Sequence, residues 1–128
     1  MPKRFPVERD DSYDEMAATY QVIEMARLNE VLRKRKIPKR VRRKICEEYF
    51  FGSGVFLDCG WLKVAGRQVW PTLCFAERPL HPTEGLGDIT KLYVPSQFFA
   101  FHEYVTGDLI SYFDESRESV RDIDHGNL

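Results

Sequence analysis

Features of secreted, metal-bound and membrane proteins are scarce in this chain. Its three cysteines (Cys46, Cys59, Cys74) are odd in number and show no C-x-x-C spacing, which argues against a disulfide scaffold and a cysteine zinc site. Its apolar runs all fall short of the roughly 20 residues that span a bilayer. The N-terminal stretch MPKRFPVERDD has no apolar signal-peptide core. We therefore expect a cytoplasmic protein without a membrane partner.

Motifs of catalysis and cofactor binding are also missing. The sequence contains no P-loop, no G-x-G-x-x-G and no triad motif, and Gly85-Leu86-Gly87 is too short to cradle a phosphate. Helix-turn-helix, zinc-finger and RRM signatures are absent as well. We therefore expect a protein that binds rather than catalyses, with no catalytic residue, metal or cofactor.

The composition is nevertheless that of a globular protein. Of its 128 residues 43% are apolar and 13% aromatic, which is enough to build a core, and the length fits one domain. The apolar residues are concentrated in the middle of the chain, between two polar ends. We predict a flexible lead-in over residues 1–11, a single domain over 12–113 and an acidic, disordered tail over 114–128.

The order of elements predicts the α+β class. A capping box at Ser12-Tyr13-Asp14-Glu15 starts a helix that reaches about Arg35, and Pro38 starts a second one that ends at Gly52-Ser53-Gly54. Three strands and a last helix follow, at residues 55–64, 67–77, 89–94 and 95–113. The order α-α-β-β-β-α predicts a helical hairpin, a three-stranded antiparallel meander and a C-terminal helix.

Apolar stripes at helical spacing predict which faces are buried. The first helix carries one stripe at Met16, Tyr20, Ile23 and Val31. A second, on another side, is formed by Met25, Leu28 and Leu32, and it predicts a possible homodimer contact. In the second helix the predicted buried stripe is Val41, Ile45 and Tyr49.

A hairpin turn at Ala65-Gly66 would place Trp61 opposite Trp70. We expect this pair to lie in the core of the sheet, and an exposed pair would instead indicate a ligand or interface site. The same register makes Cys59 and Cys74 neighbours, which we interpret as buried structural thiols.

Two histidines are the remaining candidates for a ligand site. His81 lies in the Pro/Gly-rich segment 78–88 with Glu84 and Asp88, too weak a set to predict a metal. His102 lies near the apolar side of the last helix, where a core histidine is the commoner interpretation.

One charged segment contrasts with the balanced composition. Residues 33–44 read RKRKIPKRVRRK, with nine Lys or Arg in twelve positions, although the formal net charge of the chain is −1. Segregated charge of this kind marks either a solvated helix face or a surface that binds an anion.

The helix dipole divides this run into two parts. The cations from Arg33 to Lys36 lie at the carboxyl end of the first helix, where positive charge is favourable. Those after Pro38 lie at the amino end of the second helix, where it is unfavourable and like charges repel. Because no local gain explains them, we predict an anion-binding site formed by Lys39, Arg40, Arg42, Arg43 and Lys44. On a helical wheel Arg40, Arg43 and Lys44 share one exposed face.

The anion best matched by these side chains is the phosphate backbone of a nucleic acid, bound without sequence reading, since the run lacks the Asn and Gln often used at base edges. The alternative is a protein-interaction module whose basic corner meets an acidic protein surface or the chain's own acidic segments, residues 8–15 and 108–124. A weaker alternative is a small enzyme or ligand-binding protein with its site near segment 78–88.

Overall fold

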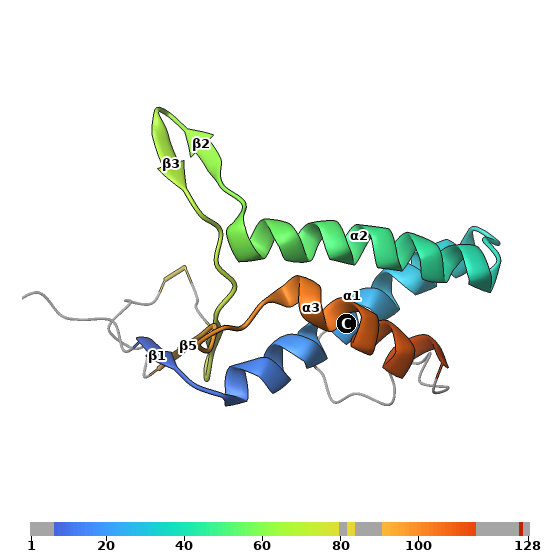
Figure 1. Ribbon diagram of the computed structural model, residues 1–128, viewed down its shortest axis with the longest axis horizontal. Helices are drawn as coiled ribbons and strands as arrows, with labels where there is room; N and C mark the ends of the chain where they lie inside the picture. The colour runs from blue at the N-terminus through green and yellow to red at the C-terminus, as the bar shows by residue number, and fades with distance from the viewer. Residues whose placement is uncertain (1–6, 80–81, 84–90, 115–125, 127–128) are drawn as a thin grey trace, which may run out of the picture.

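The body of the protein is built from helices. The computed structural model describes residues 7–79, 82–83, 91–114 and 126. In these residues α1 (Ser12–Lys34) and α2 (Lys39–Cys59) form the predicted helical hairpin, and α3 (Phe101–Leu109) packs against both (Figure 1). A short π-helix, η2 (Ile110–Asp114), continues α3. None of the described helices is long and apolar enough to cross a bilayer.

The strands form two separate sheets. The first has the order β1-β5-β4, with β1 (Val7–Arg9) parallel to β5 (Leu92–Val94) and β4 (Phe75–Ala76) antiparallel to it. The second is the hairpin of β2 (Leu62–Val64) and β3 (Arg67–Val69). The α+β class is therefore confirmed, whereas the three-stranded antiparallel meander is wrong.

The meander fails mainly because α2 is longer than expected. The helix passes through Gly52-Ser53-Gly54 and takes up residues 55–59, which the alternation of apolar side chains assigns to a strand. Gly54 allows the close approach of α3, because a Cβ there would lie 3.0 Å from the backbone nitrogen of His102. One turn later, the carboxylate of Asp58 accepts hydrogen bonds from the backbone N–H groups of Phe101 (2.6 Å) and His102 (3.0 Å). This tertiary cap outweighs the low helix propensity of glycine.

The buried face of α2 is offset by one residue from the prediction. The residues that it buries begin with a charged side chain and end with a glycine: Arg42, Cys46, Phe50 and Gly54. Tyr49, predicted as buried, is 61% exposed, and Val41 is also exposed. Neighbouring residues of a helix point about 100° apart, so the predicted stripe points away from the core by roughly that angle.

The first helix is corrected in the same way. Tyr20 and Val31 of its predicted stripe are exposed, and the residues that it buries are Tyr13, Ala17, Gln21, Met25, Ala26 and Asn29. Met25 has no exposed surface and packs with Cys46, Phe50 and the α3–η2 helix. Leu28 is partly buried against that same cluster. Met25 therefore cannot take part in the predicted homodimer contact, whereas a contact through Leu28 and Leu32, which keep some exposed surface, stays a prediction.

The β1-β5-β4 sheet is attached to the helices by aromatic side chains. Tyr13 is fully buried, contacts the rings of Phe75 and Phe99, and donates a 2.7 Å hydrogen bond to the carbonyl of Leu73. Burial raises the pKa of the Tyr13 hydroxyl, so it stays a donor under all ordinary conditions.

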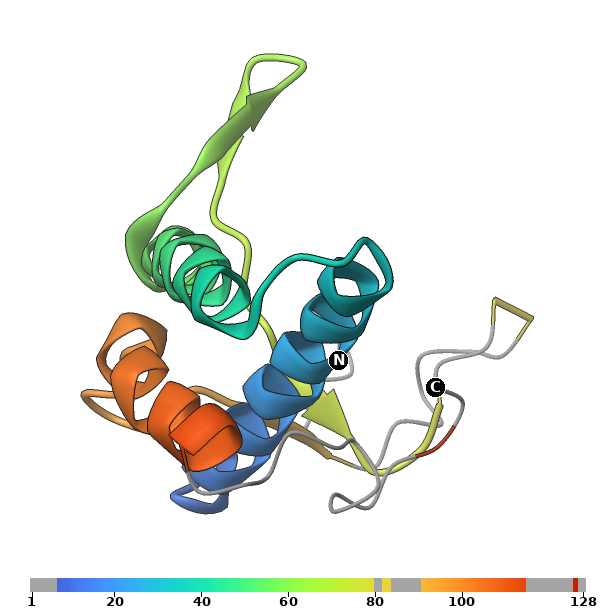
Figure 2. The same ribbon diagram turned by 90° about the vertical axis from the view of Figure 1, so that its right-hand side faces the viewer.

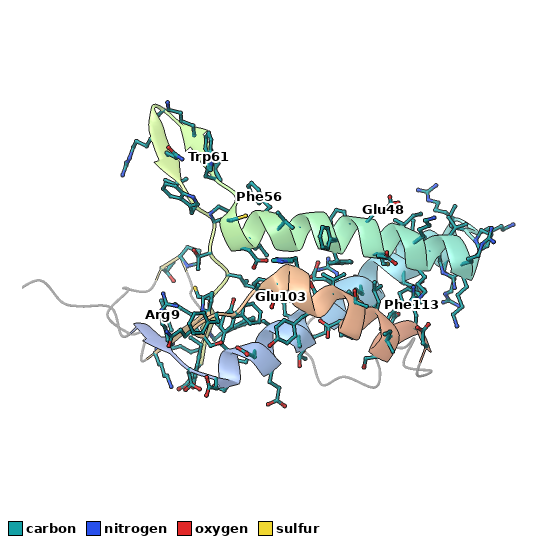
Figure 3. All side chains as sticks on the ribbon, viewed as in Figure 1. Arg9, Glu48, Phe56, Trp61, Glu103 and Phe113 are labelled. Atoms are coloured by element: carbon teal, nitrogen blue, oxygen red, sulfur yellow. The ribbon has the colours of Figure 1, made fainter. Side chains whose placement is uncertain are left out.

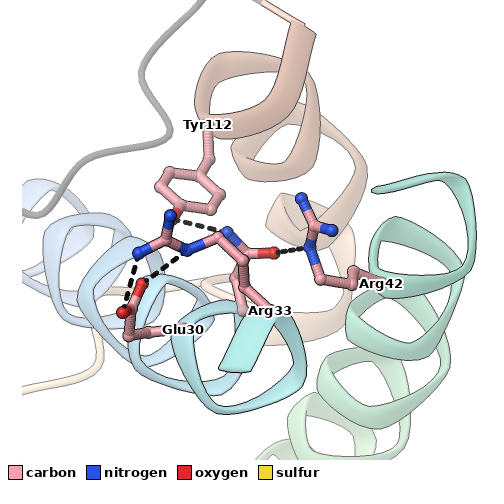
Figure 4. A network of polar contacts seen from close by, with 5 residues as sticks. Glu30, Arg33, Arg42 and Tyr112 are labelled. Carbon is pink, nitrogen blue, oxygen red and sulfur yellow. Dashed lines mark hydrogen bonds and ion pairs between the residues drawn. The ribbon is translucent and has the colours of Figure 1, made fainter. Parts of the chain in front are cut away.

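A buried polar chain joins α1, α2 and η2 (Figure 4). The guanidinium of Arg42, only 9% exposed, donates from Nε to Oδ1 of Asn29 at 2.7 Å and from Nη1 to the carbonyl of Ile37 at 2.6 Å. The Asn29 amide in turn donates to the hydroxyl of Tyr112 at 3.2 Å. One arginine of the basic run is therefore part of the core.

We expect Arg42→Ala to lower the free energy of unfolding by about 3 kcal/mol, because it leaves the Asn29 oxygen buried and without its donor. Arg40→Ala is the matched control: this exposed neighbour should change the value by no more than about 0.5 kcal/mol. Urea denaturation followed by circular dichroism measures both. Equal midpoints for the two variants would contradict the structural role of Arg42.

Candidate functional site

The basic run forms one end of the molecule, where the last turn of α1 meets the first turn of α2 (Figure 3). Arg33, Arg42 and Arg43 are each paired with other residues of the fold. Arg33 makes two hydrogen bonds to the Glu30 carboxylate at 3.1 and 2.9 Å. Arg43 contacts both carboxylate oxygens of Asp114 at 3.3 and 3.0 Å. Together with the buried Arg42, these residues serve the fold.

Two of the five residues of the predicted anion site, Arg42 and Arg43, are therefore already bound within the fold. Arg42 is not available to an external anion, because its guanidinium is buried and already donates within the core. Arg43 is partly exposed but paired with Asp114 and, at 3.7 Å, with Glu47. The expectation that Arg40, Arg43 and Lys44 share one open face therefore holds only for exposed Arg40 and Lys44.

Besides Arg33, which is exposed but paired with Glu30, six cations of the run are exposed. We call these six the basic corner: Lys34, Arg35, Lys36, Lys39, Arg40 and Lys44. Apart from Lys39, none of the six forms an ion pair with a residue that the structure describes. Half of these six cations, Lys34, Arg35 and Lys36, lie at the end of α1 and in the turn, the part that the dipole argument explains without a partner.

Lys36 occupies a conformation that favours glycine. Its φ is +62°, and the N–H groups of Lys36 and Ile37 return to the carbonyls of Arg33 (2.9 Å) and Leu32 (3.1 Å). This pattern is a Schellman C-cap, in which the left-handed residue is usually glycine. A side chain there costs on the order of 1 kcal/mol, so a charge is retained at a position where glycine would be more stable.

The β2–β3 hairpin is the second notable surface. The turn is confirmed, with positive φ at Ala65 (49°) and Gly66 (79°), and the pairing Leu62↔Val69 keeps the predicted register. The tryptophans that flank it are nevertheless exposed, Trp61 by 53% and Trp70 by 58%. The predicted sheet core is therefore wrong, because this hairpin projects beyond the end of α2 and pairs with no other described strand (Figures 1 and 2).

Exposed apolar side chains continue from the hairpin onto α2. On the hairpin they are Trp61, Leu62, Val64, Val69 and Trp70. On the last turns of α2 they are Phe51, Val55 and Phe56. Figure 3 shows Phe56 and Trp61 near the junction of the two elements. We call this set of eight residues the arm surface.

The histidine and cysteine candidates do not form a reaction centre in the described residues. His102 lies with its Nδ1 2.5 Å from Asp58 Oδ2 and its ring edge-on to Phe51, so the pair positions the start of α3. His81 lies outside the described part of the chain, and the ligand-site hypothesis for segment 78–88 stays a prediction. In the described ranges, no cluster of three or more His, Cys, Asp or Glu side chains could hold a metal ion.

The cysteines differ from the prediction as well. Cys59 and Cys74, interpreted as buried sheet neighbours, are both exposed, since Cys59 belongs to α2 and Cys74 to the segment before β4. Cys46 is the buried thiol, and burial raises its pKa to about 11. All three are free thiols.

A groove of about 420 Å³ runs along α1 and ends at Phe75. It is lined by Met16, Tyr20 and Ile23, three members of the stripe predicted to be buried. The described structure does not show what would cover this groove.

Comparison with known proteins found no matching family model, no matching curated protein and no matching solved structure. The functional interpretation therefore depends on the geometry of the basic corner and the arm surface.

The carboxyl group of Asp108 has the most perturbed acidity among the described carboxylates of α3. Burial raises its pKa to about 6, and the 2.7 Å hydrogen bond from Gln21 Nε2 opposes this shift only partly. The folded state therefore holds this proton more tightly than the unfolded chain, whose aspartates titrate near 3.9. Stability should accordingly fall as the pH rises from about 4 to about 6.

We expect Asp108→Asn to remove this fall, because the neutral amide keeps an oxygen for Gln21 and has no charge to bury. At pH 7 the variant should be more stable than the wild type by about 2 kcal/mol. Below about pH 4 the two proteins should be equally stable. Urea titrations at pH 3.5, 5 and 7 give the comparison, and a pH-independent difference would rule out the titration of Asp108 as its cause.

Proposed function

We propose that this protein binds a polyanion, of which the phosphate backbone of a nucleic acid is the best match, through the basic corner. The observation that carries the proposal is the survival of exposed cations after the internal pairs are formed. Arg33, Arg42 and Arg43 are neutralised or buried within the fold, whereas Lys34, Arg35, Lys36, Arg40 and Lys44 are exposed and form no ion pair with a described residue.

Local energetics favour a role outside the fold for these charges. Arg40 and Lys44 lie in the first turns of α2, where the helix dipole disfavours positive charge. Lys36 keeps a charged side chain in a left-handed conformation. Positions that break local rules without gain to the fold are enriched in functional sites.

A nucleic acid matches this surface better than a compact anion does. All six side chains of the basic corner are exposed, so the corner is an open surface rather than a cradle for one small ion. Long, exposed Lys and Arg side chains on two helix ends suit a row of phosphates, where binding is strengthened by counterion release. An acidic protein surface is the alternative polyanion, and competition separates the two.

The test is binding of a fluorescent 30-base-pair DNA duplex by the full-length protein across 20–200 mM salt. We expect the affinity to fall steeply, with a log–log slope of about −4.5 if five phosphates are contacted. Replacing Lys34, Arg35, Lys36, Arg40 and Lys44 by Gln should abolish the salt-dependent binding. A single replacement should reduce the slope by about one.

Lys63→Gln with Arg67→Gln is the matched control, because these exposed cations lie on the hairpin, away from the corner. This variant should keep the wild-type affinity and slope. Equal losses in the control and the corner variant would contradict a localised site. Preferential displacement of the duplex by polyglutamate of the same charge would favour an acidic protein partner instead.

A further inference from the structure

Arg43 lies on the same side of α2 as two cations of the basic corner. Arg40 precedes it by three residues and Lys44 follows it directly, and both are exposed without an ion-pair partner among the described residues. Side chains three positions apart on a helix emerge about 5–6 Å from each other. The side chain of Arg43 is itself 32% exposed. Arg43 would therefore extend the basic corner if its charge were not already paired.

The residue that pairs with it, Asp114, contacts Arg43 in the way a phosphate would. Nε and Nη2 of Arg43 lie 3.3 and 3.0 Å from Oδ1 and Oδ2 of Asp114, so that two donors meet two oxygens of one anion. A guanidinium presents the same fork of donors to two oxygens of a phosphate group. The carboxylate and a phosphate therefore compete for one edge of Arg43, and each excludes the other.

Asp114 is brought to this position by a fixed element. It is the last residue of η2, a single π-turn, which is a rare geometry that is frequent at functional sites. The two residues before it, Tyr112 and Phe113, are each 1% exposed and belong to the core cluster that includes Cys46 of α2. Because the backbone is anchored as far as Phe113, the ion pair has to order little more than two side chains. The carboxylate is thus held at the edge of the basic corner.

The fold does not depend on this ion pair. The Asp114 side chain is 46% exposed, and pairs between partly exposed side chains contribute little net stability because solvent screens them. Glu47 is the other carboxylate near Arg43, but it approaches only Nη1, at 3.7 Å. Removal of Asp114 therefore opens the Nε–Nη2 edge of Arg43 and leaves the core intact.

We propose that Asp114 is an autoinhibitory counter-ion of the basic corner, which withholds Arg43 from a bound polyanion. Arg43 is a further phosphate-binding residue that becomes available when the Asp114 carboxylate leaves its guanidinium. The proposal rests on the polyanion binding proposed above, because it concerns the regulation of that same site.

The experiment is the duplex titration described above, carried out with full-length wild type and Asp114→Ala, which removes both the charge and the competing oxygens. One added phosphate contact should make the log–log slope more negative by about 0.9. The same contact should raise the affinity on the order of tenfold at 50 mM salt. Circular dichroism verifies that the variant is folded, as expected for an exposed side chain.

Glu24→Ala is the matched control. Its carboxylate also lies 3.0 Å from an arginine, Arg27, so the substitution removes the same unit charge and releases the same kind of cation two turns before the corner on α1. The control should leave the slope unchanged. Adding Arg43→Gln to Asp114→Ala should return the slope to the wild-type value, because the released cation is then absent.

The outcomes separate this proposal from the one on which it rests. Wild-type slope and affinity in Asp114→Ala would overturn the autoinhibitory contact while leaving binding by the basic corner in place. An equal gain in Glu24→Ala would assign the effect to net charge alone. A steep slope that persists in the double variant would exclude Arg43 as the added contact. Absence of salt-dependent binding in the wild type and in Asp114→Ala would overturn both proposals.

Discussion

The buried guanidinium of Arg42 is the contact on which the arrangement of this protein depends. It fastens α2 to Asn29 of α1 and to the carbonyl of Ile37, and through Asn29 to Tyr112 of η2. A buried charge is tolerated only when its donors are satisfied, which restricts the rotation of α2 about its axis. Because Arg42 faces inward, Lys44, Glu48 and Val55 face outward. Both candidate surfaces follow from that one orientation.

The two surfaces lie at opposite ends of the same helix. A helix of 21 residues such as α2 is about 30 Å long, so its amino end can carry the basic corner while its carboxyl end carries the arm surface. The contacts that hold the ends differ as well. Arg42 holds the amino end against α1, whereas Asp58 and Gly54 hold the carboxyl end against α3. A ligand on one surface therefore leaves the other accessible.

Local patterns predicted the local features of the fold. The helical hairpin, the break between α1 and α2, the Ala65-Gly66 turn and the hairpin register all depend on neighbouring residues, and the structure has them. The candidate site was predicted less well. An arginine between two others carries no local sign that it is buried, and the apolar alternation of residues 55–59 resembles a strand until the cap that Asp58 provides for α3 is known.

The sequence by itself determined where charge is concentrated and where the chain turns, because both depend on residues adjacent along the chain. Only the tertiary structure decided which of those charges remain exposed and which aromatic residues form the core. Burial is set by contacts across more than ten residues: Arg42 with Asn29, Tyr13 with Leu73, and Asp58 with α3. The same long-range contacts leave Trp61 and Trp70 in solvent, since they bring no described element over the hairpin.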